Sequence, residues 1–229
     1  MEHPVMLLVW LMEKVGYGHF AHAYPHVVYT WFFALVLIIV GRLCISKLTL
    51  VPGRAQNFIE TIVEMISTFQ DGMMGQKGRF FFPLMASLII FVFFCNFNGL
   101  IPGSFSPTSN LNTTLALALV IVLTTHITGL FIHGFSYIKH FLGPLPFLAP
   151  MLFPVEVFSH FARILSLSLR LFGNVVGEDL VLAILFMMAG QYFMPLPMMF
   201  LATFTGFLQA FIITLLAMIY ISEAMEHAH

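Results

Sequence analysis

The sequence predicts an all-α integral membrane protein with about five membrane-crossing helices, the last two long and tilted, and one amphipathic surface helix. Of its 229 residues, 60% are hydrophobic and only 8% are charged, and the mean hydropathy is +0.98. Soluble domains carry about 25% charged residues, so this chain has too few charges to cover a surface facing water. Nine lysines and arginines against ten aspartates and glutamates leave no basic excess for binding nucleic acid.

Residues 1–229 are predicted to form one membrane domain, which begins with a lead-in over residues 1–23. The short apolar stretch in this lead-in is followed directly by Glu13 and Lys14, and not by the small residues of a signal-peptide cleavage site. The first span is predicted within residues 24–47, where aromatic residues mark one end and basic residues the other. This stretch is long enough to cross a hydrocarbon core that is about 30 Å thick.

Residues 55–74 form a different kind of segment, predicted as an amphipathic helix on the membrane surface. Its apolar face consists of Phe58, Ile62, Met65, Ile66 and Phe69. Glu60, Glu64 and Asp71 lie off that face. One side of the helix is therefore expected to enter the interface while the other side stays in water.

Two longer regions carry the remaining spans. Residues 79–133 are predicted as a helical hairpin, whose uncharged turn at 102–112 is rich in Pro, Ser and Asn. Residues 150–222 are predicted as a pair of long tilted helices. The first of these, 150–190, is about 60 Å long at about 1.5 Å per residue, roughly twice the thickness of the hydrocarbon core. That length leaves a hairpin or one strongly tilted helix, and we favour one helix.

The basic residues predict the orientation of the spans. Arg42, Lys47, Arg54, Lys77 and Arg79 lie between the first and second spans, and Lys139 follows the third. The loops at 102–112 and 190–197 have no lysine or arginine. The positive-inside rule then places the N-terminus outside and, if 150–190 crosses once, the C-terminus in the cytoplasm. A second crossing would bring an uncharged loop to the cytoplasm and fits this pattern less well.

Three charged residues form a regular row in the apolar region that begins at residue 150. Glu156, Arg163 and Arg170 are spaced seven apart, so each lies only about 20° round a helix from the one before. Polar residues three or four positions away widen this row to a stripe: Ser159, His160, Ser166 and Asn174. An arginine at the membrane centre costs about 2.5–3.5 kcal/mol on insertion scales, so the stripe is expected to face protein or water.

Arg170 is expected to lie deepest in the membrane. Its guanidinium does not lose its proton at accessible pH, so it cannot relay protons. It can form an electrostatic barrier, or attract a carboxylate that passes close to it. The other predicted spans contain no carboxylate, so the acid is expected on a partner subunit. For Arg163, snorkelling to the interface remains an alternative, and Glu156 in the headgroup layer is another.

Two adjacent acids follow Arg170 along the same segment. Glu178 lies about 80° round the helix from Arg170, and Asp179 about 180°. Their position near the outer end suits a water-filled entrance for protons, or solvated acids in the outer headgroup layer. Gln209, with Thr205 one turn away, and Asn112 can reach the same layer, where ordinary interhelical hydrogen bonds are the alternative.

Several motifs make the sequence resemble subunit a of the F-type ATP synthases. The most specific are SLSLRLFGN at 166–174 and LQAFIITLLAMIYI at 208–221, and FCNFNGLIPG at 94–103 and SNLNTTLALAL at 109–119 also match. The resemblance implies an outer span, a surface helix, a hairpin and two long tilted helices packed against a ring of c subunits. It also implies a chain without catalytic activity of its own and without a cofactor.

The resemblance assigns roles to individual residues. It implies that Arg170 faces the c-subunit carboxylate, and that Glu156, Ser159 and Arg163 line the cytoplasmic half-channel. Asn174, Asn112 and Gln209 are implied to lie near the arginine or in the outer half-channel. Asp179 falls on the family's outer-channel acid, with Glu178 beside it. The family often pairs that acid with His or Glu at the position of Ala202, so the relay here is expected to use Glu178, Asp179 and water.

The expected function is therefore that of a proton-translocating stator subunit with two offset half-channels separated by Arg170. The implied partners are the c-subunit ring, the b subunits of the peripheral stalk, the other ATP synthase subunits and membrane lipid. The implied location is the bacterial inner membrane. An alternative is a haem-binding cytochrome subunit that uses His126 and His140, because imidazole is a common axial ligand.

Overall fold

The computed structural model describes residues 7–14, 16, 18–45, 53–101, 104–134, 149–189 and 195–226. Every regular element within these ranges is a helix, which confirms the predicted all-α fold. In chain order the elements are α1 (Leu7–Lys14), α2 (Gly18–Ala23), α3 (Pro25–Ile45), α4 (Arg54–Met74), the 3-10 helix η1 (Gln76–Phe81), α5 (Phe82–Asn98), the 3-10 helix η2 (Pro107–Ser109), α6 (Leu111–His133), α8 (Ala149–Ala189) and α9 (Pro195–Glu226).

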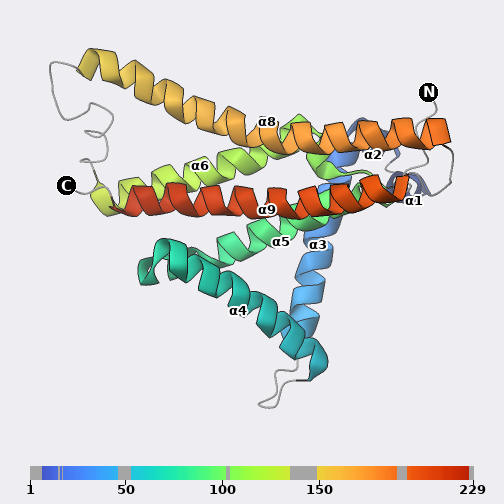
Figure 1. Cartoon of the computed structure of the whole chain (residues 1–229), viewed down its shortest axis with the longest axis horizontal. Helices are drawn as coiled ribbons and strands as arrows, with labels where there is room; N and C mark the ends of the chain where they lie inside the picture. Colours follow the sequence, from blue (N-terminus) through green and yellow to red (C-terminus); the bar gives the residue numbers. More distant parts are fainter. Residues whose placement is uncertain are drawn as a thin grey trace.

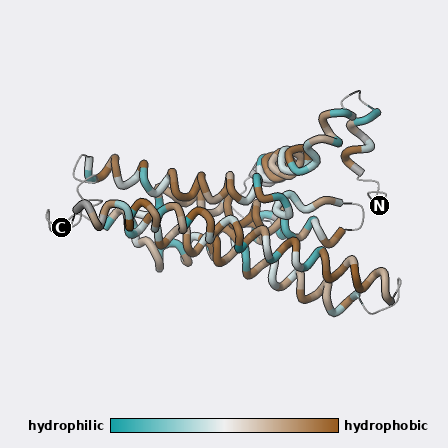
Figure 2. The backbone as a smooth tube through the Cα atoms, turned by 90° about the horizontal axis from the view of Figure 1, so that it is seen from above, coloured by the Kyte–Doolittle hydropathy of each residue, from teal (hydrophilic) through white to brown (hydrophobic). Residues whose placement is uncertain are grey.

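Five helical segments of the described chain are long and apolar enough to cross a membrane, as predicted. They are Pro25–Leu43, Gln76–Asn98, Leu111–His133, Phe153–Met188 and Pro195–Glu226. Hydrophobic residues run along almost their whole length, with short polar interruptions (Figure 2). The last two helices, α8 and α9, are the longest, with 41 and 32 residues.

The described residues 149–189 form one helix and not a hairpin. α8 continues without a break from Ala149 to Ala189. At about 1.5 Å per residue it is about 60 Å long, so it crosses a bilayer only when strongly tilted. Pro154 lies in the second turn, where it removes one backbone hydrogen bond without ending the helix.

The long helices pack into one bundle. α6, α8 and α9 run along the long axis of the molecule, and α8 diverges from α9 toward its own first turns (Figure 1). α9 lies at the centre, since it packs against α5, α6 and α8. The core between them is hydrophobic and includes Val92, Ile121, Leu171, Ile213 and Met218.

Small residues explain why α9 occupies the centre. Ala202, Gly206, Ala210 and Thr214 are spaced four apart, and all of them are buried. In lipid, where helices gain no hydrophobic energy by associating, a row of small side chains allows backbones to approach closely. Gly206 shows this directly, because a Cβ there would lie 3.3 Å from Cβ of Asn96 on α5.

The first span stands apart from this bundle. α3 crosses the long helices at a steep angle (Figure 1), and its first turns form a second hydrophobic cluster with α1 and α2. Tyr29 is the largest buried side chain there, and its ring lies 6.2 Å from the ring of Phe105. The predicted lead-in therefore contains two short helices that pack on the first span.

The amphipathic helix forms as predicted, but the bundle covers only part of its apolar face. Ile66 is buried, and the ring of Phe69 lies 4.9 Å from the ring of Phe211 on α9. Phe58 and Met65 are 67% and 69% exposed, because α4 diverges from the bundle toward its first turns (Figure 1). The uncovered half is a hydrophobic surface of the kind that enters a membrane interface.

Candidate functional site

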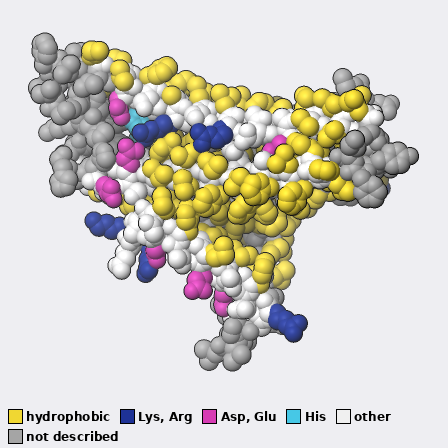
Figure 3. All heavy atoms as spheres, viewed as in Figure 1, with side chains coloured by type: hydrophobic (Ala, Val, Ile, Leu, Met, Phe, Trp, Pro, Cys, Tyr) yellow, Lys and Arg dark blue, Asp and Glu magenta, His cyan; other side chains and the backbone are white. Residues whose placement is uncertain are grey.

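Because α8 is unbroken, Glu156, Arg163 and Arg170 lie in a nearly straight row along it. Basic side chains stand on the hydrophobic surface along this helix (Figure 3). In an 18-residue apolar window of the α8 span only 17% of the residues are buried within the chain, compared with 44% in the corresponding window of the α9 span. The charged row therefore lies on the long helix that its own chain covers less.

Hydrogen bonds and ion pairs join this row to α9. Arg163 Nη1 lies 3.4 Å from Glu223 Oε2, and the Arg163 guanidinium lies 4.9 Å from the centre of the Tyr220 ring. Farther along, Asn174 Nδ2 donates to Gln209 Oε1 over 2.8 Å. From the first of these contacts to the second, the residue number increases on α8 and decreases on α9, as two antiparallel helices require.

The two acids beyond Arg170 face different neighbours. Glu178 is half-buried and accepts a hydrogen bond from the Thr205 hydroxyl on α9. Asp179 approaches the end of α5, where its Oδ1 would lie 3.4 Å from a Cβ on Gly99. The absence of a side chain at Gly99 leaves room for this carboxylate. Adjacent positions on a helix are about 100° apart, which explains the divergence.

At the other end of the row, acidic and imidazole groups from two helices gather. Glu156 Oε1 lies 3.5 Å from His160 Nε2, one turn along α8. The ring of His160 packs against the ring of His126 on α6, with 4.6 Å between their centres. Ser159 lies half-buried beside this group on α8. The row thus has titratable groups at both ends and Arg170 between them.

Arg170 differs from Arg163 because its side chain is exposed and no described residue forms a hydrogen bond or ion pair with it. By the antiparallel register, Arg170 lies level with the part of α9 between Gln209 and Tyr220, which contains no acidic residue. Gly173 and Gly177 lie close to it on the helix, and a Cβ at either glycine would meet no atom within 4 Å. The guanidinium therefore stands on an open face of α8, bordered by small residues.

One sequence prediction about the acids is wrong. The last span was expected to contain no carboxylate, but α9 continues to Glu226 and places Glu223 within the span. The sequence does indicate that Glu223 lies near the same helix face as Gln209, because the two are fourteen residues and about 40° apart round the helix. Its carboxylate pairs with Arg163, so Arg170 still has no acid from this chain.

Asn112 is not joined to the other predicted site residues by any hydrogen bond of the described chain. Its side chain is exposed at the start of α6, and its backbone N–H donates to Asn110 Oδ1, which caps the helix. His140, which the haem alternative requires, lies outside the described residues. Within the described residues, no group of three or more His, Cys, Asp or Glu side chains could hold a metal ion.

Sequence reasoning missed Asn96 on α5 as part of this region. Its Nδ2 donates to the carbonyl of Gly206 over 3.2 Å, and its Oδ1 accepts from the Thr108 hydroxyl over 2.7 Å. Gly206 is next to Thr205, so Asn96 fixes the part of α9 that contacts Glu178. The asparagine in an otherwise aromatic stretch was the available signal, because a buried amide in a membrane span needs partners.

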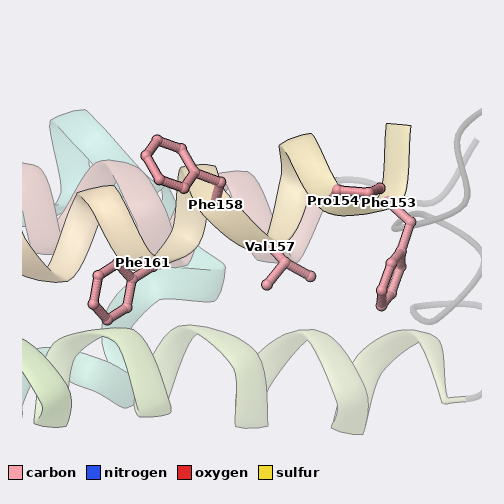
Figure 4. Close-up of a pocket in the computed structure, with 5 residues that line it drawn as sticks. All are labelled: Phe153, Pro154, Val157, Phe158 and Phe161. Atoms are coloured by element: carbon pink, nitrogen blue, oxygen red, sulfur yellow. The ribbon is translucent and has the colours of Figure 1, made fainter. Parts of the chain in front are cut away.

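A hollow of about 380 Å³ near the start of α8 does not belong to the candidate site. Phe153, Val157 and Phe161 point to one side of the helix, and Phe158 points away from them (Figure 4). Together with Pro154 these side chains give an apolar lining. Such a lining has no group that binds an ion or a proton.

Comparisons with known proteins agree on one family. The family model for "ATP synthase A chain" matches residues 27–222. Relatives described as "ATP synthase subunit a" are 52% identical in Syntrophobacter fumaroxidans, 48% in Desulfosudis oleivorans and 49% in Geotalea daltonii. Each alignment covers 100% of this chain and 100% of the relative. With five membrane-spanning helices and a match along almost its whole length, the chain belongs to the ATP synthase A chain family.

Proposed function

We propose that this chain is the proton-translocating stator subunit of a rotary ATP synthase, in which Arg170 separates two offset half-channels that face a ring of c subunits. The proposal is supported by the family of the chain and by its relatives, which are described as ATP synthase subunit a. The observation that carries the finer proposal is the exposed guanidinium of Arg170, which no described residue pairs, in the middle of an apolar span. The haem alternative has no such support from the family or from the geometry.

An unpaired arginine within a span implies a second chain. Moving such a charge into hydrocarbon costs about 2.5–3.5 kcal/mol on insertion scales, and the guanidinium cannot lose its charge to avoid this cost. A carboxylate from a neighbouring subunit would neutralise it. The exposed Ser166, Gly173 and Gly177 support the same conclusion, because small side chains allow another helix to approach the Arg170 face closely.

The two ends of the polar row form the two half-channels. Glu178, Asp179, Asn174 and Gln209 lie toward the outer end, where Asn112 completes the opening. Glu156, Ser159 and Arg163 lie toward the cytoplasmic end. Glu156 and Arg170 are fourteen residues apart, about 21 Å along the helix, so a proton cannot pass between the ends through this chain alone.

The rotor carries the proton between the half-channels. During synthesis a proton enters past Glu178 and Asp179 and neutralises a c-subunit carboxylate, which can then face lipid as the ring turns. After nearly a full turn the carboxyl reaches the Glu156 end and releases the proton. Arg170 attracts the ionised carboxylate and repels protons that would leak directly. Each proton moving through 100 mV yields about 2.3 kcal/mol.

The remaining parts of the proposal follow from the family and the charge pattern. The chain works with the c ring, the b subunits of the peripheral stalk, the other ATP synthase subunits and membrane lipid, and it carries no reaction chemistry itself. It lies in the bacterial inner membrane with the N-terminus outside and the C-terminus in the cytoplasm, because the basic residues gather between the first and second spans.

The test is Arg170→Ala in the complete ATP synthase, assayed in inverted membrane vesicles. We expect ATP-driven proton pumping and ATP synthesis to fall below detection, because the half-channels are no longer separated and the rotor carboxylate is no longer attracted. Arg54→Ala, which removes an exposed arginine from the start of α4, is the matched control and should keep both activities. Synthesis at the normal rate in the Arg170 variant would show that the proposal is wrong.

A further inference from the structure

Two histidines from different helices pack against each other near Glu156. The ring centres of His126 on α6 and His160 on α8 are 4.6 Å apart, and the ring planes meet at 68°. The His160 side chain is only 17% exposed, and its Nε2 lies 3.5 Å from Glu156 Oε1. Imidazole is the side chain whose unperturbed pKa lies nearest to neutral pH, which makes such a pair a candidate for binding and releasing a proton.

Three helices contribute charged or titratable groups around the pair. α6 provides His126, and α9 provides Tyr220 and Glu223. α8 provides Glu156, His160 and Arg163. His133, two turns farther along α6, is occupied by a hydrogen bond of 3.0 Å with the carbonyl oxygen of Ala224.

Two glutamates and one arginine lie around the histidine pair. Glu223 and the Tyr220 ring contact Arg163, and the Glu156 carboxylate lies 3.5 Å from Nε2 of His160. With both imidazoles neutral, one arginine against two glutamates leaves one negative charge. A single proton on the pair brings the total to zero. A second proton would be repelled by the first at the 4.6 Å ring separation.

We infer that His126 and His160 together form a binding site for one exchangeable proton in the half-channel that contains Glu156. The inference rests on the proposed function and extends it to α6. During synthesis the Glu156 carboxyl loses its proton and becomes a carboxylate, while a ring nitrogen of His160 gains that proton. The imidazolium then releases it to water on the cytoplasmic side. During ATP-driven pumping the same transfers run in reverse.

The test uses the complete enzyme in inverted vesicles, where pumping draws protons from the medium through this half-channel. The variants are His160→Gln and His126→Gln, which keep a polar side chain but do not titrate. A positioned general acid or base contributes about 100-fold or more to proton transfer, and since water can partly replace it we expect about a tenfold loss of pumping at about pH 8. At about pH 6, where protons are abundant, the loss should be less than about twofold.

The control is His133→Gln, which lies on the same helix and keeps a donor for the Ala224 carbonyl. It should pump like the unmodified enzyme at every pH. The amount of assembled complex is measured by its ATP hydrolysis, and if one histidine variant fails to assemble, the other carries the test. An equal loss at all pH values would show a packing role only and overturn the inference, as would an unchanged pH profile.

Failure of this inference and failure of the proposed function are distinguishable. If Arg170→Ala abolishes pumping while the histidine variants keep the normal pH profile, the proposed half-channels are supported and the proton site at His126 and His160 is wrong. If Arg170→Ala pumps normally, the proposed function itself is wrong, whatever the histidine variants do.

Discussion

The neighbours Glu178 and Asp179 show how one helical step separates two similar side chains. Glu178 accepts a hydrogen bond from Thr205 on α9, whereas Asp179 lies toward Gly99 at the end of α5. Glu178 therefore shares the α8–α9 contact surface with Asn174 and Gln209, nearer to Arg170. From this arrangement we propose that Glu178 is the acid through which the outer half-channel of the proposed function connects to the arginine.

Replacing Thr205 by valine tests this assignment. The change keeps the shape of the side chain but removes the hydroxyl that donates to Glu178. Hydrogen bonds to charged groups contribute about 1.5–3 kcal/mol, so losing the fixed position of the carboxylate should lower ATP-driven proton pumping by about tenfold. Thr205→Ser restores the hydroxyl and should restore pumping. Equal rates in the valine and serine variants would contradict the role.

A second residue-level prediction concerns Asp71 at the end of α4. Arg79 donates to both of its carboxylate oxygens, and this hydrogen bonding holds the pKa of Asp71 below its usual value. A lowered pKa means that the pair stabilises the fold above the ordinary carboxyl pKa of about 3.9, and that this contribution is lost as the pH falls through the lowered value. The pair is exposed, so salt should weaken it.

The measurement is an NMR titration of the Asp71 carboxyl carbon in detergent micelles. In Arg79→Gln the titration midpoint should rise toward that of a free aspartate. Arg54→Gln removes a charge from the far end of the same helix and should leave the Asp71 midpoint unchanged. An unchanged midpoint in the Arg79 variant would mean that the ion pair does not form in solution.

At the scale of secondary structure elements, a buried network of polar side chains ties the α5–α6 connection to the bundle. Asn96 bonds to Gly206 on α9 and to Thr108 in η2. Ser106 lies 2.8 Å from the Thr108 hydroxyl and donates to the carbonyl of Cys95 over 3.0 Å. The network thus fixes three elements around Glu178 and Asp179, in a region where lipid offers no alternative hydrogen bonds.

Asn96→Ala should therefore destabilise the chain more than its size suggests. The change leaves the Gly206 carbonyl and the Thr108 hydroxyl without their asparagine partner, and an unsatisfied buried polar group costs about 1–3 kcal/mol. The free energy of unfolding in mixed micelles measures this loss. Ser87→Ala, at an exposed position of the same helix, is the control and should change it by less than about 0.5 kcal/mol. Equal costs for the two variants would refute the role of the network.

The helices could be predicted because each depends on a pattern within its own stretch of sequence. Each span is an apolar stretch of sufficient length, and the spacing of Glu156, Arg163 and Arg170 shows one face of a helix without any tertiary information. The pairing of Arg163 with Glu223 could not be predicted in the same way, because it depends on the register between α8 and α9. The partial covering of α4 likewise depends on where the bundle ends, and not on the pattern of α4 itself.

In the candidate site, too, local features could be predicted from the sequence and contacts between helices could not. The identity of Arg170 as an unusual cation follows from its position in an apolar stretch, whereas its lack of a partner requires the opposite helix to be placed. His126 and His160 are 34 positions apart, and nothing in their spacing indicates that their rings meet. Contacts between helices were therefore the part of the site that the sequence could not supply.

For the whole molecule, the odd number of spans among the described residues predicts termini on opposite sides of the membrane. A membrane-impermeant thiol reagent tests this on a chain whose cysteines, Cys44 and Cys95, are replaced by serine. A cysteine at exposed His22 should react only from outside, and cysteines at exposed Gln76 and Glu226 only from the cytoplasmic side. Labelling of His22→Cys and Glu226→Cys from the same side would contradict the predicted topology.

In the proposed function, the open face of α8 around Arg170 lies against an acid-bearing helix of another subunit. The most direct measurement is disulfide cross-linking in the assembled enzyme, with Ser166→Cys or Gly173→Cys in this chain and a cysteine beside the c-subunit carboxylate. Leu35→Cys, exposed on α3, is the control. We expect a cross-linked product from each α8 cysteine and none from α3. If neither α8 position gives a product in an assembled enzyme, the c subunit does not lie against this face and the proposed function is wrong.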